Sequence, residues 1–215
     1  MYKIVAIDGP AGSGKGTIAK ILSKECNLLY IDTGAMYRAI AYGMLKNNIK
    51  IGEEDKIIEL AKNSKIEFID GKTYLDGQDI SSEIRSMEVT KIVSPVSSII
   101  ELRKILVNLR RKMAEGCDVV MEGRDITTVV FPNATYKFYL DADVEVRAKR
   151  RYDENLSKGI NVSFEEILEN IKKRDYNDMH KEVGALTRSE DSIYIDSSNM
   201  SIEEVVEKIK SKIEV

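Results

Sequence analysis

Short apolar runs alternate with longer stretches of helical periodicity along most of this chain. Lys3–Ile7 reads Lys-Ile-Val-Ala-Ile, a β-branched run typical of a buried parallel strand, and Ile18, Ile21 and Leu22 then recur at helical spacing. Strands that alternate with helices favour an α/β fold with a parallel-sheet core flanked by helices. The same pattern predicts further strands at Leu28–Ile31, Asp118–Met121, Tyr136–Leu140 and Ile193–Ile195, and helices ending near Leu45 and spanning about Glu53–Ala61, Ile99–Glu115, Val144–Leu156, Phe164–Asp178 and Ser201–Ile213.

One segment departs from this alternation. Lys65–Ile69, Thr73–Leu75 and Gln78–Ile80 are short strand-like runs separated by Asp70-Gly71 and Asp76-Gly77. Asp-Gly between such runs is a strong hairpin signal, so we expect three antiparallel strands here. They would form a small insertion near residues 65–80 of an otherwise parallel layout.

The helical pattern also predicts where individual helices begin and end. It resumes at about Ser82, is interrupted by Pro95, and then continues until Gly116, a residue type that commonly stops helices. Near the other end of the chain, Ser201 is expected to cap the last helix and Glu204 to complete its capping box.

The composition excludes several classes of function. The 215 residues carry 33 Lys plus Arg against 36 Asp plus Glu, and a net charge of -3 gives no general attraction to nucleic acid or to an anionic membrane. No apolar run approaches the roughly 18 residues of a membrane span, and Met1–Asp8 leads directly into a strand, so we expect a cytoplasmic protein without a membrane or nucleic-acid partner. Cys26, Cys117 and the single histidine, His180, lack metal-ligand spacing. This argues against a zinc site and against a Ser-His or Cys-His nucleophile, and we assign no metal-ligating residue.

The first predicted strand and helix are joined by a glycine-rich loop. Glycines let successive backbone N–H groups point inward at phosphate oxygens, and the helix that begins near Lys15 adds its positive dipole end. The Lys15 ammonium would bridge the terminal phosphates of a nucleotide. Gly16 occupies the place where the general P-loop pattern has a hydroxyl, and Thr17 follows one position later. The expected phosphate-binding residues are Gly9, Pro10, Ala11, Gly12, Ser13, Gly14, Lys15, Gly16 and Thr17.

Arginines are placed where a second phosphate group would bind. A phosphoryl transferase needs one cationic cluster for the donor triphosphate and another for the acceptor, because charge spreads over the transferred group as it moves. Ligands gather at the carboxyl ends of parallel strands, so Thr33 and Arg38 are expected near the loop. Lys15 would serve the donor, while Arg38, Arg124 and Arg174 are candidates for contacts with the acceptor or the group in flight.

No residue stands out as a general base. An acceptor phosphate oxygen is already anionic near neutral pH, whereas a sugar or shikimate-like hydroxyl would call for a carboxylate base. Asp32 and Asp125 are candidates for that base. The residues therefore favour a phosphate acceptor and leave an alcohol acceptor open.

Four segments together resemble the bacterial cytidylate kinases, a family of nucleoside monophosphate kinases with the P-loop kinase fold. These segments are Gly9–Thr17, with the spelling G-x-x-G-x-G-K-G-T, Asp32–Arg38, Glu122–Pro132 and Lys173–Asp175. The resemblance spans essentially the whole chain, and the insertion near residues 65–80 is similar to that family's enlarged monophosphate-binding domain. It implies that ATP phosphorylates CMP, and dCMP as well, with Mg²⁺ bridging the donor phosphates.

The resemblance also implies roles for single residues. Its catalytic positions correspond to Lys15, Arg38, Arg124 and Arg174. Its base-reading positions correspond to Ser94, Arg103 and Asp125, and its ribose contacts to Arg174 and Asp178. Its acceptor-phosphate contacts correspond to Thr33, Arg38, Arg124 and Lys181, the last of which stands where the family more often has arginine.

The expected domain organisation follows from the same resemblance. Residues 1–33, 100–141 and 183–215 would form the P-loop core, residues 34–99 the monophosphate-binding domain, and residues 142–182 a short helical lid. Arg147, Arg150 and Arg151 lie on the first basic helix of this segment and are similar to arginines that close over ATP, with Arg150 and Arg151 as the implied ATP contacts. We expect a monomer.

Alternative functions remain at this stage. The same loop would serve a kinase for UMP, AMP or a shikimate-like alcohol. A nucleotide switch that signals by shape is a second class, although the sequence contains no Asn-Lys-x-Asp guanine-reading tetrapeptide. Nucleic-acid binding through the basic helices is disfavoured by the net charge and by the interleaved Glu154, Glu165, Glu166 and Glu169.

Overall fold

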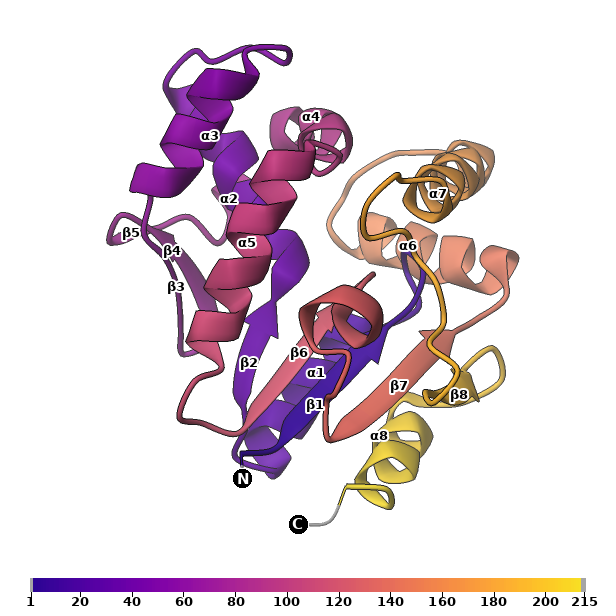
Figure 1. The fold of residues 1–215 in the computed structure, drawn as a ribbon. Coiled ribbons are helices and arrows are strands. Elements are labelled where there is room, and N and C mark those ends of the chain that lie inside the picture. Colours follow the sequence, from indigo (N-terminus) through magenta and orange to yellow (C-terminus); the bar gives the residue numbers. More distant parts are fainter. Residues whose placement is uncertain (1, 214–215) are drawn as a thin grey trace. The chain divides into compact units, whose positions relative to one another are not determined.

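Two compact units make up the structure. The computed structural model describes residues 2–213, drawn in Figure 1. The first unit contains the chain up to Leu29 and again from Cys117 onward, and the second runs from Tyr30 to Gly116. The predicted phosphate loop belongs to the first unit and the predicted antiparallel insertion to the second.

A parallel sheet forms the centre of the first unit. β1 pairs in parallel with β6 and β7, and β7 pairs in parallel with β8. Val5, Ala6 and Ile7 of β1 have no exposed surface, as expected for a central strand covered on both faces. The five-stranded sheet has the order β2-β6-β1-β7-β8, with β1 (Ile4–Asp8), β2 (Leu29–Asp32), β6 (Val119–Gly123), β7 (Tyr136–Asp141) and β8 (Ile193–Asp196). The carboxyl ends of β1, β6, β7 and β8 therefore lie at one edge, where ligands of such sheets bind.

Two helices from opposite ends of the chain pack together in this unit. α1 (Lys15–Glu25) contacts β1, β6 and α8 (Ile202–Lys210). Ser201 and Glu204 form the predicted capping box at the start of α8, since the Ser201 N–H donates to Glu204 at 2.7 Å and the Glu204 N–H donates to the Ser201 hydroxyl at 3.2 Å.

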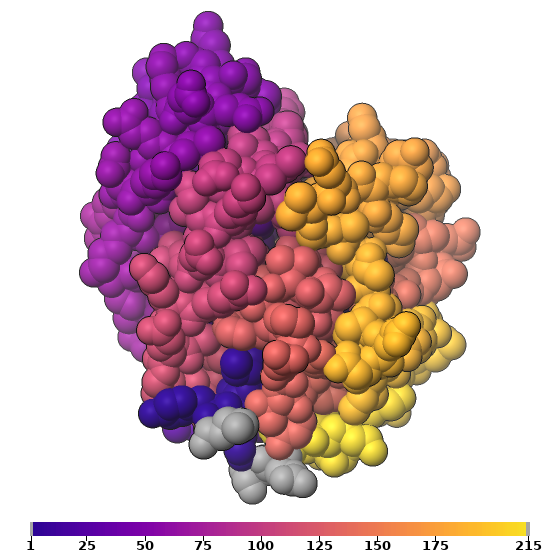
Figure 2. All heavy atoms as spheres, viewed as in Figure 1, coloured from indigo at the N-terminus to yellow at the C-terminus, as the bar shows by residue number. Residues whose placement is uncertain are grey.

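The basic helices form a second pair. α6 (Val144–Ser157) and α7 (Phe164–Met179) pack against each other through a small apolar cluster around Ala148, Ile167 and Ile171. The connection from α7 to β8, orange in Figures 1 and 2, runs beside β7, where Lys137 donates to the carboxylate of Asp191. Both predicted helices and their turn near Gly159, with a φ of 70°, are confirmed.

The second unit contains the antiparallel insertion. Its sheet has the order β3-β4-β5, and both connecting turns have positive φ at their two central residues: 51° and 75° at Asp70-Gly71, and 51° and 80° at Asp76-Gly77. This geometry matches the twist of paired strands, which confirms the hairpin prediction. The elements of the unit are α2 (Thr33–Lys46), α3 (Glu54–Asn63), β3 (Ile66–Ile69), β4 (Lys72–Leu75), β5 (Gln78–Asp79), the short turn η1 (Glu83–Arg85), α4 (Met87–Val96) and α5 (Ile100–Met113).

The structure corrects the predicted helix that starts near Ser82. Residues 83–85 form the η1 turn, and the α-helix begins only at Met87, where the Ser86 hydroxyl accepts from the Val89 N–H at 3.3 Å. Ser82 and Ser86 carry the same local capping signal, so the sequence does not rank them. Pro95 does not interrupt the helix before its end, because it lies in the last turn and α4 continues to Val96.

The three predicted functional segments are not identical with the two compact units. α5 lies within the second unit, whereas the sequence analysis placed residues 100–141 in the core. Compactness does not test function, so the division into core, monophosphate-binding domain and lid stays a prediction. Among residues 2–213, no helix has the length and apolar character needed to cross a membrane.

Candidate active site

The glycine-rich loop connects the carboxyl end of β1 to the start of α1. Gly12 and Gly14 have φ values of 78° and 92°, in the region that favours glycine. At Gly9, an added Cβ would lie 2.0 Å from the carbonyl oxygen of Leu140, so the loop passes too close to β7 for any side chain. α1 begins at Lys15 with Gly14 as its N-cap, which leaves the first N–H groups of the helix without a side-chain cap. These features form a backbone cradle for an anion.

Lys15 is buried within this cradle. It is only 4% exposed, and its Nζ donates to the Pro10 carbonyl at 2.7 Å and to the Ser13 hydroxyl at 3.3 Å. Burial, together with the charges of Arg124 and Arg174, lowers the pKa of Lys15 to about 7 against the opposing influence of Glu122 and Asp8. All three predicted catalytic cations of the first unit, Lys15, Arg124 and Arg174, therefore lie close enough for their charges to interact.

A carboxylate bridges two of the predicted acceptor contacts. Asp178 accepts from Arg124 Nε at 2.8 Å and from Lys181 Nζ at 2.8 Å. Burial alone would raise the pKa of Asp178, but the charges of Arg124 and Lys181 hold it well below its usual range. Asp178 is therefore ionised at neutral pH and compensates both cations. The structure groups these three residues as the sequence predicted, although here they contact one another.

Asp8 positions the segment that carries Arg124 and Asp125. This carboxylate has no exposed surface and accepts from the Ile126 N–H at 2.9 Å, the Thr127 N–H at 2.7 Å and the Thr127 hydroxyl at 2.7 Å. It thereby holds the start of the helical turn η2 (Ile126–Val130), directly after Asp125, which is 3% exposed. Sequence reasoning missed Asp8, although an aspartate that ends a buried parallel strand is a usable signal.

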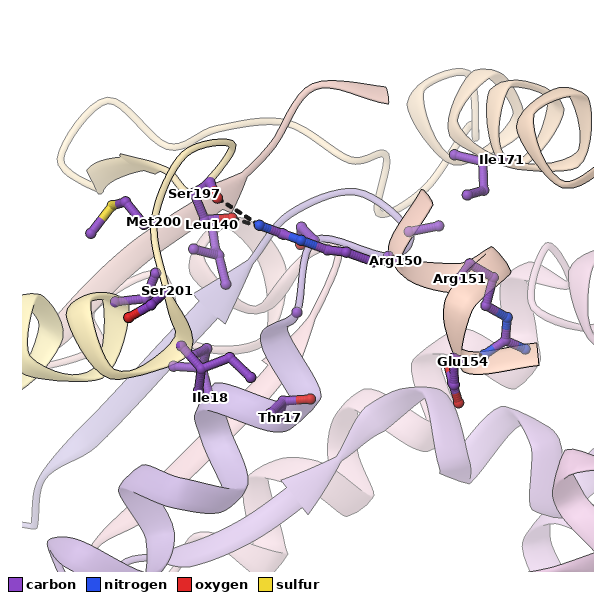
Figure 3. Close-up of a pocket in the computed structure, with 16 residues that line it drawn as sticks. Thr17, Ile18, Leu140, Arg150, Arg151, Glu154, Ile171, Ser197, Met200 and Ser201 are labelled. Atoms are coloured by element: carbon purple, nitrogen blue, oxygen red, sulfur yellow. Dashed lines mark hydrogen bonds and ion pairs between the residues drawn. The ribbon is translucent and has the colours of Figure 1, made fainter. Parts of the chain in front are cut away.

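A cavity of about 580 Å³ lies beside the phosphate loop. Figure 3 shows Arg150 reaching from α6 toward Ser197, where it donates to the carbonyl at 2.6 Å and to the hydroxyl at 3.2 Å. Arg151 also lines the cavity and pairs with Glu154 at 2.8 Å. The structure thus brings both predicted ATP-binding arginines to the loop.

The remaining walls of this cavity were not anticipated from the sequence. They include Ile18 and Leu140 and, from the segment between β8 and α8, Ser197 and Met200, whereas Thr17, which also lines the cavity, belongs to the predicted phosphate loop. The β8–α8 segment is short and polar, so nothing local marks it as a binding surface. Arg147, the third predicted lid arginine, is not among the residues that line the cavity.

Four predicted site residues belong to the second unit. Thr33 is buried at the first position of α2, and Arg38 one turn later pairs with Asp32 at 3.0 Å. Ser94 lies on α4. Arg103 of α5 is 4% exposed and donates to the Ser97 carbonyl at 2.9 Å, and its guanidinium lies 5.7 Å from the ring centre of Tyr37, the neighbour of Arg38.

The metal-ligating side chains of the described part of the chain do not converge. Within residues 2–213, no three His, Cys, Asp or Glu side chains come together in a group that could hold a metal ion. The hydrogen-bond donors at the loop are backbone N–H groups and the ammonium of Lys15, and such groups bind an anion.

A phosphate cradle at the carboxyl end of a central parallel strand, with buried cations beside it, defines a P-loop phosphotransferase. The chain belongs to the cytidylate kinase family, whose model matches residues 5–215. It is therefore a nucleoside monophosphate kinase, and the resemblance read from the motifs is confirmed.

Individual relatives support this assignment. A cytidylate kinase of Alkaliphilus oremlandii is 52% identical over 205 residues, which cover 95% of this chain and 94% of that protein. A cytidylate kinase of Clostridioides difficile is 47% identical over 210 residues, with 98% and 97% covered. In fold alone, the chain is similar to the crystal structure of an uncharacterized protein from Eubacterium ventriosum, with a TM-score of 0.57 at 15% identity and 98% of each chain covered.

Proposed function

We propose that the protein transfers the terminal phosphoryl group of ATP to CMP and to dCMP, giving ADP and the corresponding diphosphate. The observation that carries this proposal is the position of Lys15, buried in the phosphate loop with its Nζ 2.7 Å from the Pro10 carbonyl, where the charges of Arg124 and Arg174 also act on it. Burial and the charges of Arg124 and Arg174 disfavour the ammonium form of Lys15 more than Glu122 and Asp8 favour it, although Arg124 is itself paired with Asp178. A transferring phosphoryl group supplies the charge that makes this arrangement favourable.

The donor nucleotide is assigned to the loop and the adjoining cavity. The Lys15 ammonium and backbone N–H groups within Gly9–Thr17 would hold the phosphates, except at Pro10, which has no N–H, and at Ala11, whose N–H donates to Asp175. The apolar side chains of Ile18, Met200 and Val205 line the same cavity and suit a nucleobase, while Arg150 and Arg151 lie at its α6 side.

Mg²⁺ is proposed to arrive with the triphosphate. The Thr17 hydroxyl lines the cavity at the first turn of α1 and is the kind of hard oxygen ligand that Mg²⁺ prefers. The ion would supply charge neutralisation of the donor phosphates, and Thr17 would orient it.

The acceptor contacts are assigned residue by residue, each for its own chemistry. Thr33, Arg38, Arg124 and Lys181 would bind the acceptor phosphate, and Arg174 and Asp178 the ribose. Ser94, Arg103 and Asp125 would read the base, because cytosine offers an amino donor to a carboxylate and acceptors to an arginine. When the acceptor phosphate binds, it would replace Asp178 as the partner of Arg124 and Lys181 and free that carboxylate for the sugar.

No proton has to be removed from a phosphate acceptor. Its oxygen is already anionic near neutral pH, so the chain needs only to orient it and exclude water. We propose that residues 142–182 act as the lid that does this. We further propose a cytoplasmic monomer, which size-exclusion chromatography with light scattering would test.

A coupled ADP-release assay tests the proposed reaction and substrate together. ATP and Mg²⁺ are supplied with CMP, dCMP, UMP, AMP, GMP or shikimate, and without any acceptor. We expect turnover with CMP and dCMP, and kcat/KM for UMP lower by roughly tenfold to more than a hundredfold. Preference for another acceptor would replace CMP in this proposal, and hydrolysis that is independent of any acceptor would support the nucleotide switch.

A further inference from the structure

One residue of the phosphate loop, Ala11, is held through both of its main-chain polar groups by an ion pair from the two basic helices. The Ala11 N–H donates to Asp175 Oδ1 at 3.1 Å, and the Ala11 carbonyl accepts from Arg147 at 2.8 Å. Arg147 and Asp175 are themselves paired at 2.5 Å. The Asp175 carboxylate on α7 thus accepts from the Ala11 N–H, and the Arg147 guanidinium on α6 donates to the Ala11 carbonyl.

Arg147 also fixes where α6 leaves the sheet. Its Nε donates to the carbonyl of Ala142 at 2.9 Å, in the link between β7 and α6. The loop packs closely against this part of α6, since an added Cβ at Gly12 would lie 3.3 Å from the Arg147 Cβ. One side chain therefore joins the end of β7, the phosphate loop and α7.

The pair differs from the solvent-exposed ion pairs on these helices. The side chains of Arg147 and Asp175 are 7% and 10% exposed, whereas those of Lys149 and Asp153 on α6 are 62% and 55% exposed. A buried ion pair loses hydration and often gives no net stability over an apolar replacement. Hydrogen bonds to both main-chain polar atoms of Ala11 offset the lost hydration of this pair. We therefore expect the pair to fix the geometry of the loop more than to increase the free energy of unfolding.

We propose that Arg147 and Asp175 are positioning residues that hold the backbone of Ala11 on both sides and thereby set the phosphate loop for ATP. Asp175 directly follows Arg174, and Arg147 lies one turn before Arg150. The pair consequently also holds these two nucleotide-directed arginines in register with the loop. This inference rests on the proposed binding of ATP at the loop.

Three variants separate positioning from simple destabilisation. Asp175→Asn keeps the volume and an acceptor for the Ala11 N–H but removes the charge that holds Arg147. Arg147→Met removes every contact of the guanidinium, and Arg147→Lys restores a cation with fewer donors. Lys149→Met, which breaks the exposed pair on the same helix, is the matched control.

Two measurements are made on each variant without acceptor. Calorimetric titration with ATP and Mg²⁺ is expected to show a Kd raised about tenfold by Asp175→Asn and Arg147→Met, less by Arg147→Lys, and unchanged by Lys149→Met. Hydrogen exchange of ligand-free protein is expected to be about tenfold faster at the Ala11 amide in the first two variants, with unchanged exchange in β1.

Steady-state kinetics add a second distinction. KM for ATP should rise more than KM for CMP in Asp175→Asn, because the pair bonds both main-chain polar atoms of Ala11 in the donor loop, whereas Arg174, the proposed ribose contact, is affected only as the neighbour of Asp175. Exchange of the Ala11 amide does not depend on nucleotide, so it tests the lock even if the wild-type protein failed to bind ATP and the proposed function fell. The inference would be overturned if folded Asp175→Asn and folded Arg147→Lys exchanged the Ala11 amide at the same rate as the wild type and bound ATP with the same Kd. This test holds whether or not Arg147→Met folds.

Discussion

The charged groups of the first unit are arranged differently beside the phosphate loop and on the outer faces of the basic helices. Near the loop, two buried ion pairs join distant parts of the chain: Arg124 and Asp178 are 54 residues apart, and Arg147 and Asp175 are 28 apart. On the outer face of α7, Lys172 and Glu169 are three residues apart, with side chains 50% and 72% exposed. Both regions are rich in charge, but only the first keeps charge away from water.

This difference shows where charge serves function. A buried ion loses several kcal/mol of hydration, so a chain retains it where a fixed geometry is needed, whereas exposed pairs contribute about 0–1 kcal/mol. Amino-acid composition alone does not distinguish the two regions, because both are rich in charged residues. The contrast therefore predicts that substitutions beside the loop change catalysis or stability strongly and that those on the outer faces change neither.

The largest effect is expected at Lys15. Lys15→Ala should leave the fold intact and lower kcat by about 10²–10³, the loss typical when one preorganised transition-state donor is removed. Lys24→Ala, an exposed lysine on the same helix, is the control. Turnover is measured by ADP release and folding by circular dichroism. Near-normal turnover of folded Lys15→Ala would remove the basis for assigning this loop to the donor phosphates.

A large loss of stability is expected at Thr127. Its hydroxyl donates to the buried Asp8 carboxylate at 2.7 Å, and Thr127→Val replaces it with a methyl of similar shape. Burial raises the pKa of Asp8, so the contribution of this hydrogen bond lies between about 0.5 kcal/mol for a neutral carboxyl and about 3 kcal/mol for a carboxylate, and urea unfolding should show a decrease within that range. Thr127→Ser keeps the hydroxyl and should lose less. Equal losses in both variants would mean that packing, and not the contact with Asp8, matters at this position.

The Thr127 contact also shows why the site was only partly predictable. Asp8 and Thr127 are 119 residues apart, and the local sequence around either residue does not predict their contact. The glycine-rich loop was readable because one local segment contains the glycines, the lysine and the helix start. Arg147 illustrates the opposite case: its spacing on α6 matches that of Arg150 and Arg151, yet its guanidinium bonds to Ala11 and Asp175.

The fold was more predictable than the site for the same reason. Apolar runs such as Val119–Met121 and the Asp-Gly turns determine local structure through steric preference and burial. Errors arose where two local signals were equivalent, as at Ser82 and Ser86. The walls of the nucleotide cavity depend on which loops meet at the sheet edge, and Ser197 and Met200 carry no signal for that.

Base recognition is expected to depend on Asp125. An amide can donate toward O4 of uracil where a carboxylate cannot, so Asp125→Asn should lose CMP activity while narrowing the CMP-to-UMP ratio of kcat/KM. The mismatch with uracil costs on the order of 1–3 kcal/mol in the wild type, which is roughly a tenfold to hundredfold preference. The ADP-release assay gives the CMP-to-UMP ratio of kcat/KM for the wild type and for Asp125→Asn. An equal decrease for CMP and UMP would show that Asp125 supports the site without reading the base.

A smaller effect is expected in the protons exchanged on ATP binding. Burial and the charges of Arg124 and Arg174 hold the pKa of free Lys15 at about 7, and a triphosphate beside the ammonium would raise it. Binding at pH 8 should therefore take up a fraction of a proton, and ATP affinity should weaken as pH rises above 7. Calorimetry in buffers of different ionisation enthalpy measures this uptake. The number of protons taken up by Lys15→Ala is subtracted from that of the wild type, because it accounts for protons exchanged by ATP itself. Equal proton uptake by the two proteins would contradict the pKa assigned to Lys15.

The smallest effect is expected on the outer face of α7. Lys172 pairs with Glu169 at 3.1 Å in full contact with solvent, where water screens the charges and both side chains give up rotamer freedom to meet. Lys172→Ala should change the free energy of unfolding by less than about 0.5 kcal/mol and leave kcat and both KM values unchanged. Urea unfolding at low and high salt measures the first, and ADP release the second. A loss of activity here comparable to that of Lys15→Ala would mean that the outer face contacts a substrate, and the distinction between buried and exposed charge would no longer mark the site.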